Sequence, residues 1–250
     1  MSVGENDRLR FADATAAAEA RVRAAGGIGT LGERTLHAAL KLYYEPNTDL
    51  HEVAVGQFVA DIKNADGIIE IQTRGFHALR KKLEAYLPLA HVTVVYPLAA
   101  RKWISVLDRE TGTLTEKRRS PKRETPLDAL WELSFILPYI GDGHLTLRLP
   151  MLEVLELRRR GGRRWKNSTT RMERLPLALI DEVVLCTKAD FRALLPEDLP
   201  ETFTAADFAA AVKRNKKFTQ KALQTLSALG ILSRCGKVRN AYLYKRRSED

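Results

Sequence analysis

Several features that mark large classes of protein are scarce in this sequence. It has only two cysteines, Cys186 and Cys235, and neither has a Cys or His neighbour at zinc-binding spacing. Its five histidines form no His-Glu-x-x-His or other paired-His motif of the kind that holds a catalytic zinc. We therefore expect two reduced thiols, no disulfide framework and no zinc site.

The chain also lacks a run of about 20 apolar residues that could cross a bilayer, and Met1 is not followed by a charged and then apolar leader. It is rich in charge instead. The 41 Lys and Arg residues against 31 Asp and Glu make the formal net charge +10, and 45% hydrophobic residues are enough for a core. A surface of this charge gains from displacing counterions around phosphates. The expectation is a soluble, cytoplasmic protein with a polyanionic partner and no membrane contact.

Hydrophobic periodicity divides the first 100 residues into elements. An N-terminal helix over 8–25 stops at Gly26-Gly27. The pattern then predicts a helix, three strands, a helix and a strand, in that order: 30–45, 51–55, 58–62, 68–73, 76–87 and 91–96. This order is typical of an α/β core.

The middle of the chain gives a less regular pattern. It predicts a hairpin of 103–107 and 114–117, a helix over 127–140 and a strand over 152–157. A basic loop over 158–166 follows, then a helix over 175–185 and a linker over 196–200.

Two acidic residues fall on neighbouring predicted strands. Glu70 and Gln72 are two residues apart, so their side chains leave the same face of the sheet. Asp61 sits near the end of the preceding strand, and a short turn would bring it beside Glu70. Carboxylates that converge among apolar strands repel each other unless a proton or a cation lies between them. Mg²⁺ or Mn²⁺ is the expected occupant, because Mg²⁺ takes one or two carboxylates together with water and phosphate oxygens.

Asp61, followed after a hairpin by Glu70-Ile71-Gln72 and then by a helix and an apolar strand, resembles the PD-(D/E)xK nuclease superfamily. The resemblance covers roughly residues 31–97. It implies that Asp61 and Glu70 bind the metal and that Gln72, at the position of the superfamily's lysine, orients the attacking water. It also implies that Glu33, on the first core helix, faces the metal site.

The sequence departs from the superfamily pattern in two places. Ala60 replaces the usual proline, and Gln72 can hold a water but brings no positive charge to the transition state. The metal or a nearby cation must supply that charge, and the candidate cations are Arg74, Arg80 and Lys81.

Each of these residues also has a structural explanation. Thr30-Leu31-Gly32-Glu33 is a capping box, in which Glu33 satisfies the helix N-terminus. Asp61 could be a turn residue at the end of a strand. Glu70 and Gln72 could lie on the solvent-exposed face of an antiparallel strand. The run Arg80-Lys81-Lys82 fits a solvated helix face.

The C-terminal residues predict a separate basic element. A capped helix start at Thr202, a basic turn, a helix over 218–229 and a hairpin of 231–234 and 241–244 follow one another. This order resembles a winged helix-turn-helix, in which the second helix enters the major groove and the hairpin touches the DNA backbone. Protein docking is the alternative use of such a module. The side chains expected to contact nucleic acid here are Lys217, Gln220, Lys221, Gln224, Lys237 and Arg239.

The basic loop in the middle of the chain is a further candidate contact. Its indole could stack a base while its cations hold a phosphate backbone, although a solubilising loop is the alternative. The residues concerned are Arg163, Arg164, Trp165 and Lys166.

Together these features predict an α/β (α+β) fold with a restriction-endonuclease-like core, a mixed central sheet flanked by helices, and a small C-terminal winged helix domain. The expected domains are a helical arm (1–27), the nuclease core (28–150), the basic loop with a connecting segment (151–198) and the winged helix-turn-helix (199–250).

The expected function is metal-dependent hydrolysis of phosphodiester bonds, by an endonuclease acting on double-stranded DNA. A DNA-binding protein on the same scaffold without turnover is the first alternative, supported by the missing lysine, and a docking protein is the second. Cutting both strands needs two active sites, so a homodimer is compatible with this expectation.

Overall fold

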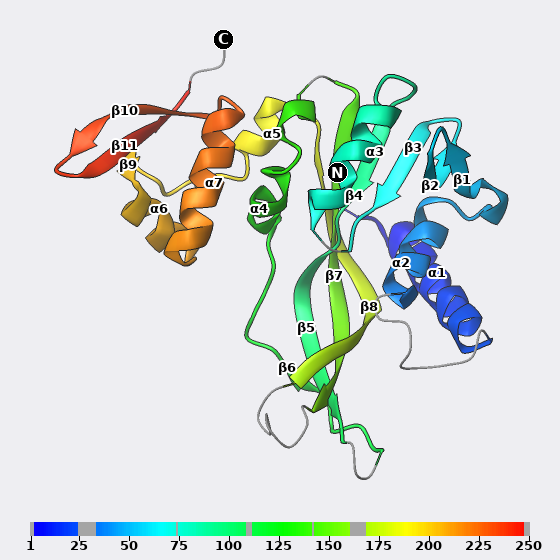
Figure 1. Cartoon of the computed structure of the whole chain (residues 1–250). Helices are drawn as coiled ribbons and strands as arrows, with labels where there is room; N and C mark the ends of the chain where they lie inside the picture. The colour runs from blue at the N-terminus through cyan, green and yellow to red at the C-terminus, as the bar shows by residue number, and fades with distance from the viewer. Residues whose placement is uncertain are drawn as a thin grey trace. The chain divides into compact units, whose positions relative to one another are not determined.

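A computed structural model describes residues 3–24, 34–73, 75–108, 112–141, 143–160 and 169–247 (Figure 1). The chain divides into two compact units, each made of three segments. The first comprises Met1–Arg74, Thr93–Thr125 and Arg148–Val183, and the second comprises Gly75–Val92, Pro126–Leu147 and Val184–Asp250. The two units are therefore interleaved along the sequence.

The first unit begins with two helices and an antiparallel meander. These elements are α1 (Glu5–Ala24), α2 (Arg34–Tyr44), β1 (His51–Val55), β2 (Phe58–Asn64) and β3 (Gly67–Ile71). A tight turn joins β2 to β3, in which Asn64 Oδ1 accepts a hydrogen bond from Asp66 N at 3.1 Å and Gly67 adopts φ +128°. Across the described ranges, no helix combines the length and apolar character needed to cross a membrane.

The meander belongs to a larger mixed sheet with the order β1-β2-β3-β4-β7-β5-β6, in which β8 also pairs with β7. Its other strands are β4 (Val92–Val95), β5 (Leu98–Leu107), β6 (Arg118–Arg119), β7 (Leu145–Arg160) and β8 (Thr169–Leu185). β5 and β7 run parallel, whereas the β1–β2, β2–β3 and β5–β6 pairs are antiparallel. The prediction of an α/β fold with a mixed central sheet and flanking helices is therefore confirmed.

Helix α2 is attached to the sheet through one apolar face. Leu36, Leu40 and Tyr43 recur at helical spacing, and the two leucines are 0% exposed. They share a buried cluster with Ile62 of β2 and Ile71 of β3, and α1 reaches the same cluster. This packing holds α2 against the end of the hairpin that carries the acidic residues.

Two predictions for the middle of the chain are wrong, and a third is confirmed only in part. Residues 175–185 form the second half of strand β8, not a helix, because pairing with β7 decides the structure of an apolar run whose periodicity fits either state. The helix predicted over 127–140 is broken into the short turns η3 (Pro126–Asp128) and η4 (Leu137–Tyr139) around α4 (Ala129–Leu133). Pro138 contributes to this break, since a proline disfavours the helical conformation of the residue before it.

The hairpin predicted over 103–117 is present only in part. Its first arm is the end of β5, which has an antiparallel bridge between Leu107 and Leu114. The next pairing partner of β5 is β6, through Trp103–Arg119 and Ile104–Arg118. The second arm predicted over 114–117 is therefore reduced to a single bridge.

The second unit holds the remaining helices and a small sheet. Its elements are η2 (Phe76–Ala78), α3 (Leu79–Tyr86), α4, α5 (Lys188–Arg192), β9 (Thr202–Thr204), α6 (Ala205–Val212), α7 (Lys216–Ala228), β10 (Leu232–Val238) and β11 (Ala241–Arg246). The small sheet has the order β10-β11-β9 and is antiparallel throughout. Thr204 and Asp207 form a capping box at the start of α6, as the sequence predicts, and Lys213 in the left-handed conformation turns the chain into α7.

The packing of α2 can be tested by truncating one of its buried side chains. Leu36→Ala should lower the free energy of unfolding by about 2–5 kcal/mol, because the deleted atoms leave a cavity in the shared cluster. Val59→Ala, at a side chain on β2 that is 53% exposed, should change it by no more than about 0.5 kcal/mol. Urea unfolding followed by circular dichroism measures both, and equal losses would contradict the placement of α2.

Candidate functional site

Strand register brings three carboxylates to one level of the meander. Ile62 of β2 pairs with Ile69 of β3, so Asp61 and Glu70 are the next residues along the two strands. On the other side of β2, the flanking pairs of β1 and β2 place Glu52 opposite Asp61. Glu52, Asp61 and Glu70 therefore lie side by side on neighbouring strands, and the hairpin carries Asp61 to Glu70 as the sequence predicts.

The Asp61 carboxylate has two close polar neighbours. The backbone N–H of Ile71 donates to Asp61 Oδ2 at 2.7 Å, just past the last paired residues of β2 and β3. The same oxygen lies 3.3 Å from His37 Nε2 of α2. Asp61 thus ties the end of the hairpin to the helix, which is a structural role independent of any metal.

Lys41 of α2 forms an ion pair with the neighbouring carboxylate, Glu52. Lys41 Nζ lies 2.8 Å from Glu52 Oε1, and the lysine side chain is 12% exposed whereas that of Glu52 is 71% exposed. Glu52 has a backbone φ of +53°, a left-handed conformation that is uncommon for residues other than glycine. The hydrogen bond and the charge of Lys41 lower the pKa of Glu52, against the opposing effects of burial and of Asp61.

Among the other predicted site residues, Glu70 and Gln72 differ in burial, and six residues lie outside the part of the chain that the structure describes. Glu70 is 0% exposed, so this carboxylate is fully buried in β3. Gln72 follows the end of β3, is partly buried, and donates its backbone N–H to Val95 O at 2.8 Å. Glu33 and Arg74 lie outside the described residues, as do Arg163, Arg164, Trp165 and Lys166.

The predicted cations Arg80 and Lys81 belong to α3 in the second unit and are exposed. Arg80 Nε lies 3.2 Å from Glu84 Oε1, one helical turn away, and Tyr139 donates its hydroxyl to the same oxygen at 2.7 Å. This arrangement is the one expected for the alternative interpretation, a solvated helix face.

Sequence reasoning missed three residues of this cluster: His37, Lys41 and Glu52. The signal for the first two was available, because residues 33, 37 and 41 are spaced four apart and share one face of a helix. The approach of Glu52 to Lys41 depends on its left-handed backbone conformation, for which the sequence carries no signal.

Two carboxylates are enough for the metal that the sequence leads us to expect. Within the described ranges, no group of three or more His, Cys, Asp or Glu side chains is arranged to hold a metal ion. Mg²⁺, however, keeps several waters and uses one or two protein carboxylates. Asp61 and Glu70 supply that number of carboxylates; the Asp61 side chain is 18% exposed, whereas Glu70 is 0% exposed in β3. A carboxylate that binds metal is itself commonly hydrogen-bonded, as Asp61 is.

Another buried acid, Glu156 of β7, has a different environment. It accepts a hydrogen bond from Arg158 Nε at 2.7 Å and lies 3.7 Å from Lys102 Nζ. Burial raises the pKa of Glu156, but the hydrogen bond from Arg158 and the charges of Lys102 and Arg174 outweigh burial and lower it. Glu156 is therefore a carboxylate neutralised by protein cations, as buried structural charges are.

The predicted contact residues of the C-terminal part fall on two elements. Lys217, Gln220 and Gln224 are exposed on α7, whereas Lys221 is partly buried; Lys237 and Arg239 are exposed at the tip of the β10–β11 hairpin. Two of these lysines already have aromatic partners: Lys217 Nζ lies 5.4 Å from the ring centroid of Trp131, and Lys221 Nζ lies 5.3 Å from that of Phe135.

The geometry defines a mixed α/β protein with a carboxylate cluster at the end of a sheet hairpin. Residues 34–186 match the family described as Domain of unknown function (DUF8091), and the chain belongs to this family. An uncharacterized protein of Treponema pallidum (strain Nichols) is 31% identical over 185 residues, which is 73% of each chain. No solved structure matches. The matched range runs from the first residue of α2 to just past β8, so it includes the carboxylate cluster and excludes α6, α7 and the small sheet.

The pairing of Lys41 with Glu52 can be tested through the pKa of Glu52. Lys41→Met should raise it towards the usual value of about 4.3, because the hydrogen bond and the charge that stabilise the carboxylate are lost. A lowered pKa stabilises the fold above the unfolded-state pKa, and that stabilisation disappears as pH falls through the folded-state pKa. The stability difference between the two proteins should therefore shrink in acid.

Carboxyl NMR titration of Glu52 measures this change. Lys63→Met, at an exposed lysine on β2, is the matched control and should leave the Glu52 titration in place. An unchanged Glu52 titration in Lys41→Met would show that the pair does not form.

Proposed function

We propose that the protein is a metal-dependent nuclease that hydrolyses phosphodiester bonds, acting as a DNA endonuclease. The observation that carries the proposal is the placement of Asp61 and Glu70 side by side on β2 and β3. Support comes from the element order α2-β1-β2-β3-α3-β4, which is the helix, three strands, helix and strand of the superfamily that the sequence resembles.

In this proposal Asp61 and Glu70 would hold Mg²⁺ or Mn²⁺. Such a metal, when bound, would supply a water of lowered pKa and stabilisation of charge on the phosphate. Ile71 N–H and His37 hold the Asp61 carboxylate in position. Gln72 would orient the attacking water through its amide, and Glu33, which lies outside the described residues, would assist.

The proposed substrate is double-stranded DNA. The formal charge of +10 supports a phosphate-rich partner. The order β9-α6-α7-β10-β11 supports a winged helix-turn-helix in the C-terminal part, which would add nucleic-acid contacts to the core. Cutting both strands would take two copies of the site, as in a homodimer, and we place the activity in the cytoplasm.

A specific observation favours a second candidate, a DNA-binding protein without turnover. Asp61 Oδ2 already accepts from Ile71 N–H and lies beside His37, so the carboxylate has a structural use without metal. Gln72 in place of lysine also removes a charge that hydrolysis would use. The two candidates differ in one property, metal-dependent cleavage.

Cleavage should be assayed on plasmid, linear, single-stranded and branched DNA and on RNA, with Mg²⁺ or Mn²⁺ against EDTA. Asp61→Asn and Glu70→Gln should each lower the cleavage rate by more than about 100-fold, because even residues that only support a metal ligand are worth about 10- to 100-fold. Asp61→Asn keeps a carbonyl oxygen that can accept from Ile71 N–H, so its fold should persist.

The matched control is Asp66→Asn, which removes one carboxylate at the exposed turn between β2 and β3. It should cleave within about twofold of the unchanged protein, as surface changes usually do. Full cleavage by both site variants would overturn the assignment of the site. Binding without cleavage on every substrate would favour the non-catalytic candidate.

A further inference from the structure

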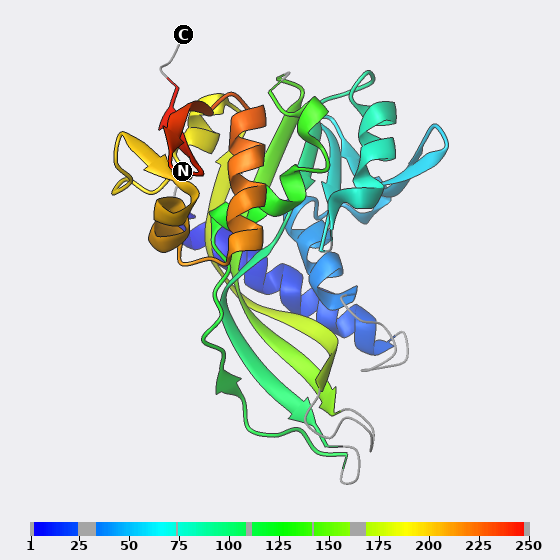
Figure 2. The same ribbon diagram turned by 60° about the vertical axis from the view of Figure 1, so that its left-hand side comes forward.

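One flank of helix α7 is covered by α4 in the same unit (Figures 1 and 2). Arg214, just before α7, forms a bidentate ion pair with Asp128, in which Nε lies 2.9 Å from Oδ1 and Nη2 lies 2.7 Å from Oδ2. Further along α7, the buried Thr225 donates its hydroxyl to Leu130 O at 3.1 Å. The two contacts attach both ends of this flank to α4 and the residue before it.

The lysines between these contacts are turned towards aromatic rings. Lys217 and Lys221 lie one helical turn apart and hold their ammonium groups 5.4 and 5.3 Å from the ring centroids of Trp131 and Phe135. A duplex that received this flank of α7 in its major groove would have to displace both cation–π contacts. The ammonium groups of Lys217 and Lys221 therefore already have partners, while the Lys217 side chain as a whole is exposed.

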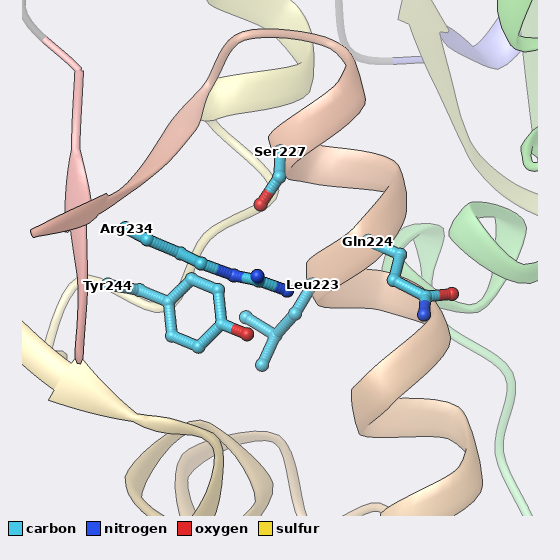
Figure 3. A pocket seen from close by; sticks show the side chains of 5 residues that line it. All are labelled: Leu223, Gln224, Ser227, Arg234 and Tyr244. Carbon is cyan, nitrogen blue, oxygen red and sulfur yellow. The ribbon is translucent and has the colours of Figure 1, made fainter. Parts of the chain in front are cut away.

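The opposite flank of α7 is open and faces the β10–β11 hairpin. A pocket of about 390 Å³ lies between them, lined by Leu223, Gln224, Ser227, Arg234 and Tyr244. Figure 3 shows the Arg234 side chain running from β10 towards α7, beside the ring of Tyr244. The guanidinium of Arg234 and the hydroxyl groups of Tyr244 and Ser227 thus face one groove, and no lining residue is acidic.

The hairpin wall of this groove is basic and partly aromatic. Arg234 Cζ lies 4.1 Å and Lys237 Nζ lies 4.7 Å from the ring centroid of Tyr242, which is 42% exposed. Stacking on this ring holds two long cationic side chains in an ordered position at the surface. Arg239 and Lys245 are also exposed on the hairpin.

The charge around the groove is of one sign. Residues 208–247 include eleven Lys and Arg and no Asp or Glu. When such a cationic stretch binds nucleic acid, it releases counterions from the phosphates, which favours the complex. An arginine side chain can grip a phosphate with two parallel hydrogen bonds.

On the basis of the nuclease function proposed above, we propose that the groove between α7 and the β10–β11 hairpin binds the phosphodiester backbone of nucleic acid. Arg234 and Lys237 are the phosphate contacts. Lys217 and Lys221 do not line this groove and take no part in the proposed contact.

Binding of short labelled DNA, as single strand and as duplex, should be measured by fluorescence anisotropy with the full chain in EDTA, between about 50 and 200 mM salt. The double variant Arg234→Ala/Lys237→Ala should weaken binding at least tenfold, roughly, and lower the slope of log affinity against log salt by about 2. The matched control Lys217→Ala/Lys221→Ala removes the same charge from the same unit. It should keep the salt slope and bind within about twofold of the unchanged protein.

Arg234→Lys/Lys237→Arg retains both charges and should retain the slope, which separates a charge contact from a folding defect. Equal losses in the hairpin variant and its control would overturn the proposal, as would an unchanged hairpin variant. Displacement of the DNA by polyglutamate of equal charge would assign the groove to an acidic protein surface instead.

Because EDTA prevents metal-dependent cleavage, binding is tested apart from turnover. A protein that binds DNA through this groove without ever cutting it contradicts only the nuclease. A protein that cuts DNA and whose hairpin variant binds normally contradicts only the groove.

Discussion

The candidate site depends on how the pairing of β2 with β3 ends. A buried backbone donor needs an acceptor, and the Ile71 N–H finds one in Asp61 Oδ2 at 2.7 Å, just past the pair of Ile62 and Ile69. The contact holds the Asp61 carboxylate beside Glu70 and within 3.3 Å of His37. The register of β1, β2 and β3 therefore sets the carboxylates side by side, and this one hydrogen bond fixes the Asp61 carboxylate among them.

Helix α2 makes that arrangement rigid on one side. Its apolar face, with Leu36 and Leu40, is buried against the sheet, and its polar face brings His37 to Asp61 and Lys41 to Glu52. A carboxylate that binds a metal usually has such outer partners, which set its orientation. The same partners would serve a purely structural aspartate, and the binding of a metal is the property that distinguishes the two roles.

Local periodicity was enough to predict the meander, α2 and the capped start of α6, because each is determined by residues close in sequence. It failed for 175–185, where the long-range partner β7 makes a strand of an apolar run. The Asp61–Glu70 approach could be predicted from a short turn, whereas the left-handed Glu52 could not. Likewise, nothing in the sequence of α7 indicates that Lys217 and Lys221 lie against the rings of Trp131 and Phe135.

The central claim is that Asp61 and Glu70 form a divalent-metal site. A Mn²⁺ titration of the full chain without nucleic acid, followed by water-proton relaxation, tests it most directly, since Mn²⁺ accepts the same oxygen ligands as Mg²⁺. The account predicts one saturable Mn²⁺ site that Mg²⁺ displaces, that Glu70→Gln abolishes and that Asp66→Asn leaves unchanged. A Mn²⁺ titration that is the same for the unchanged protein and for Glu70→Gln would contradict it.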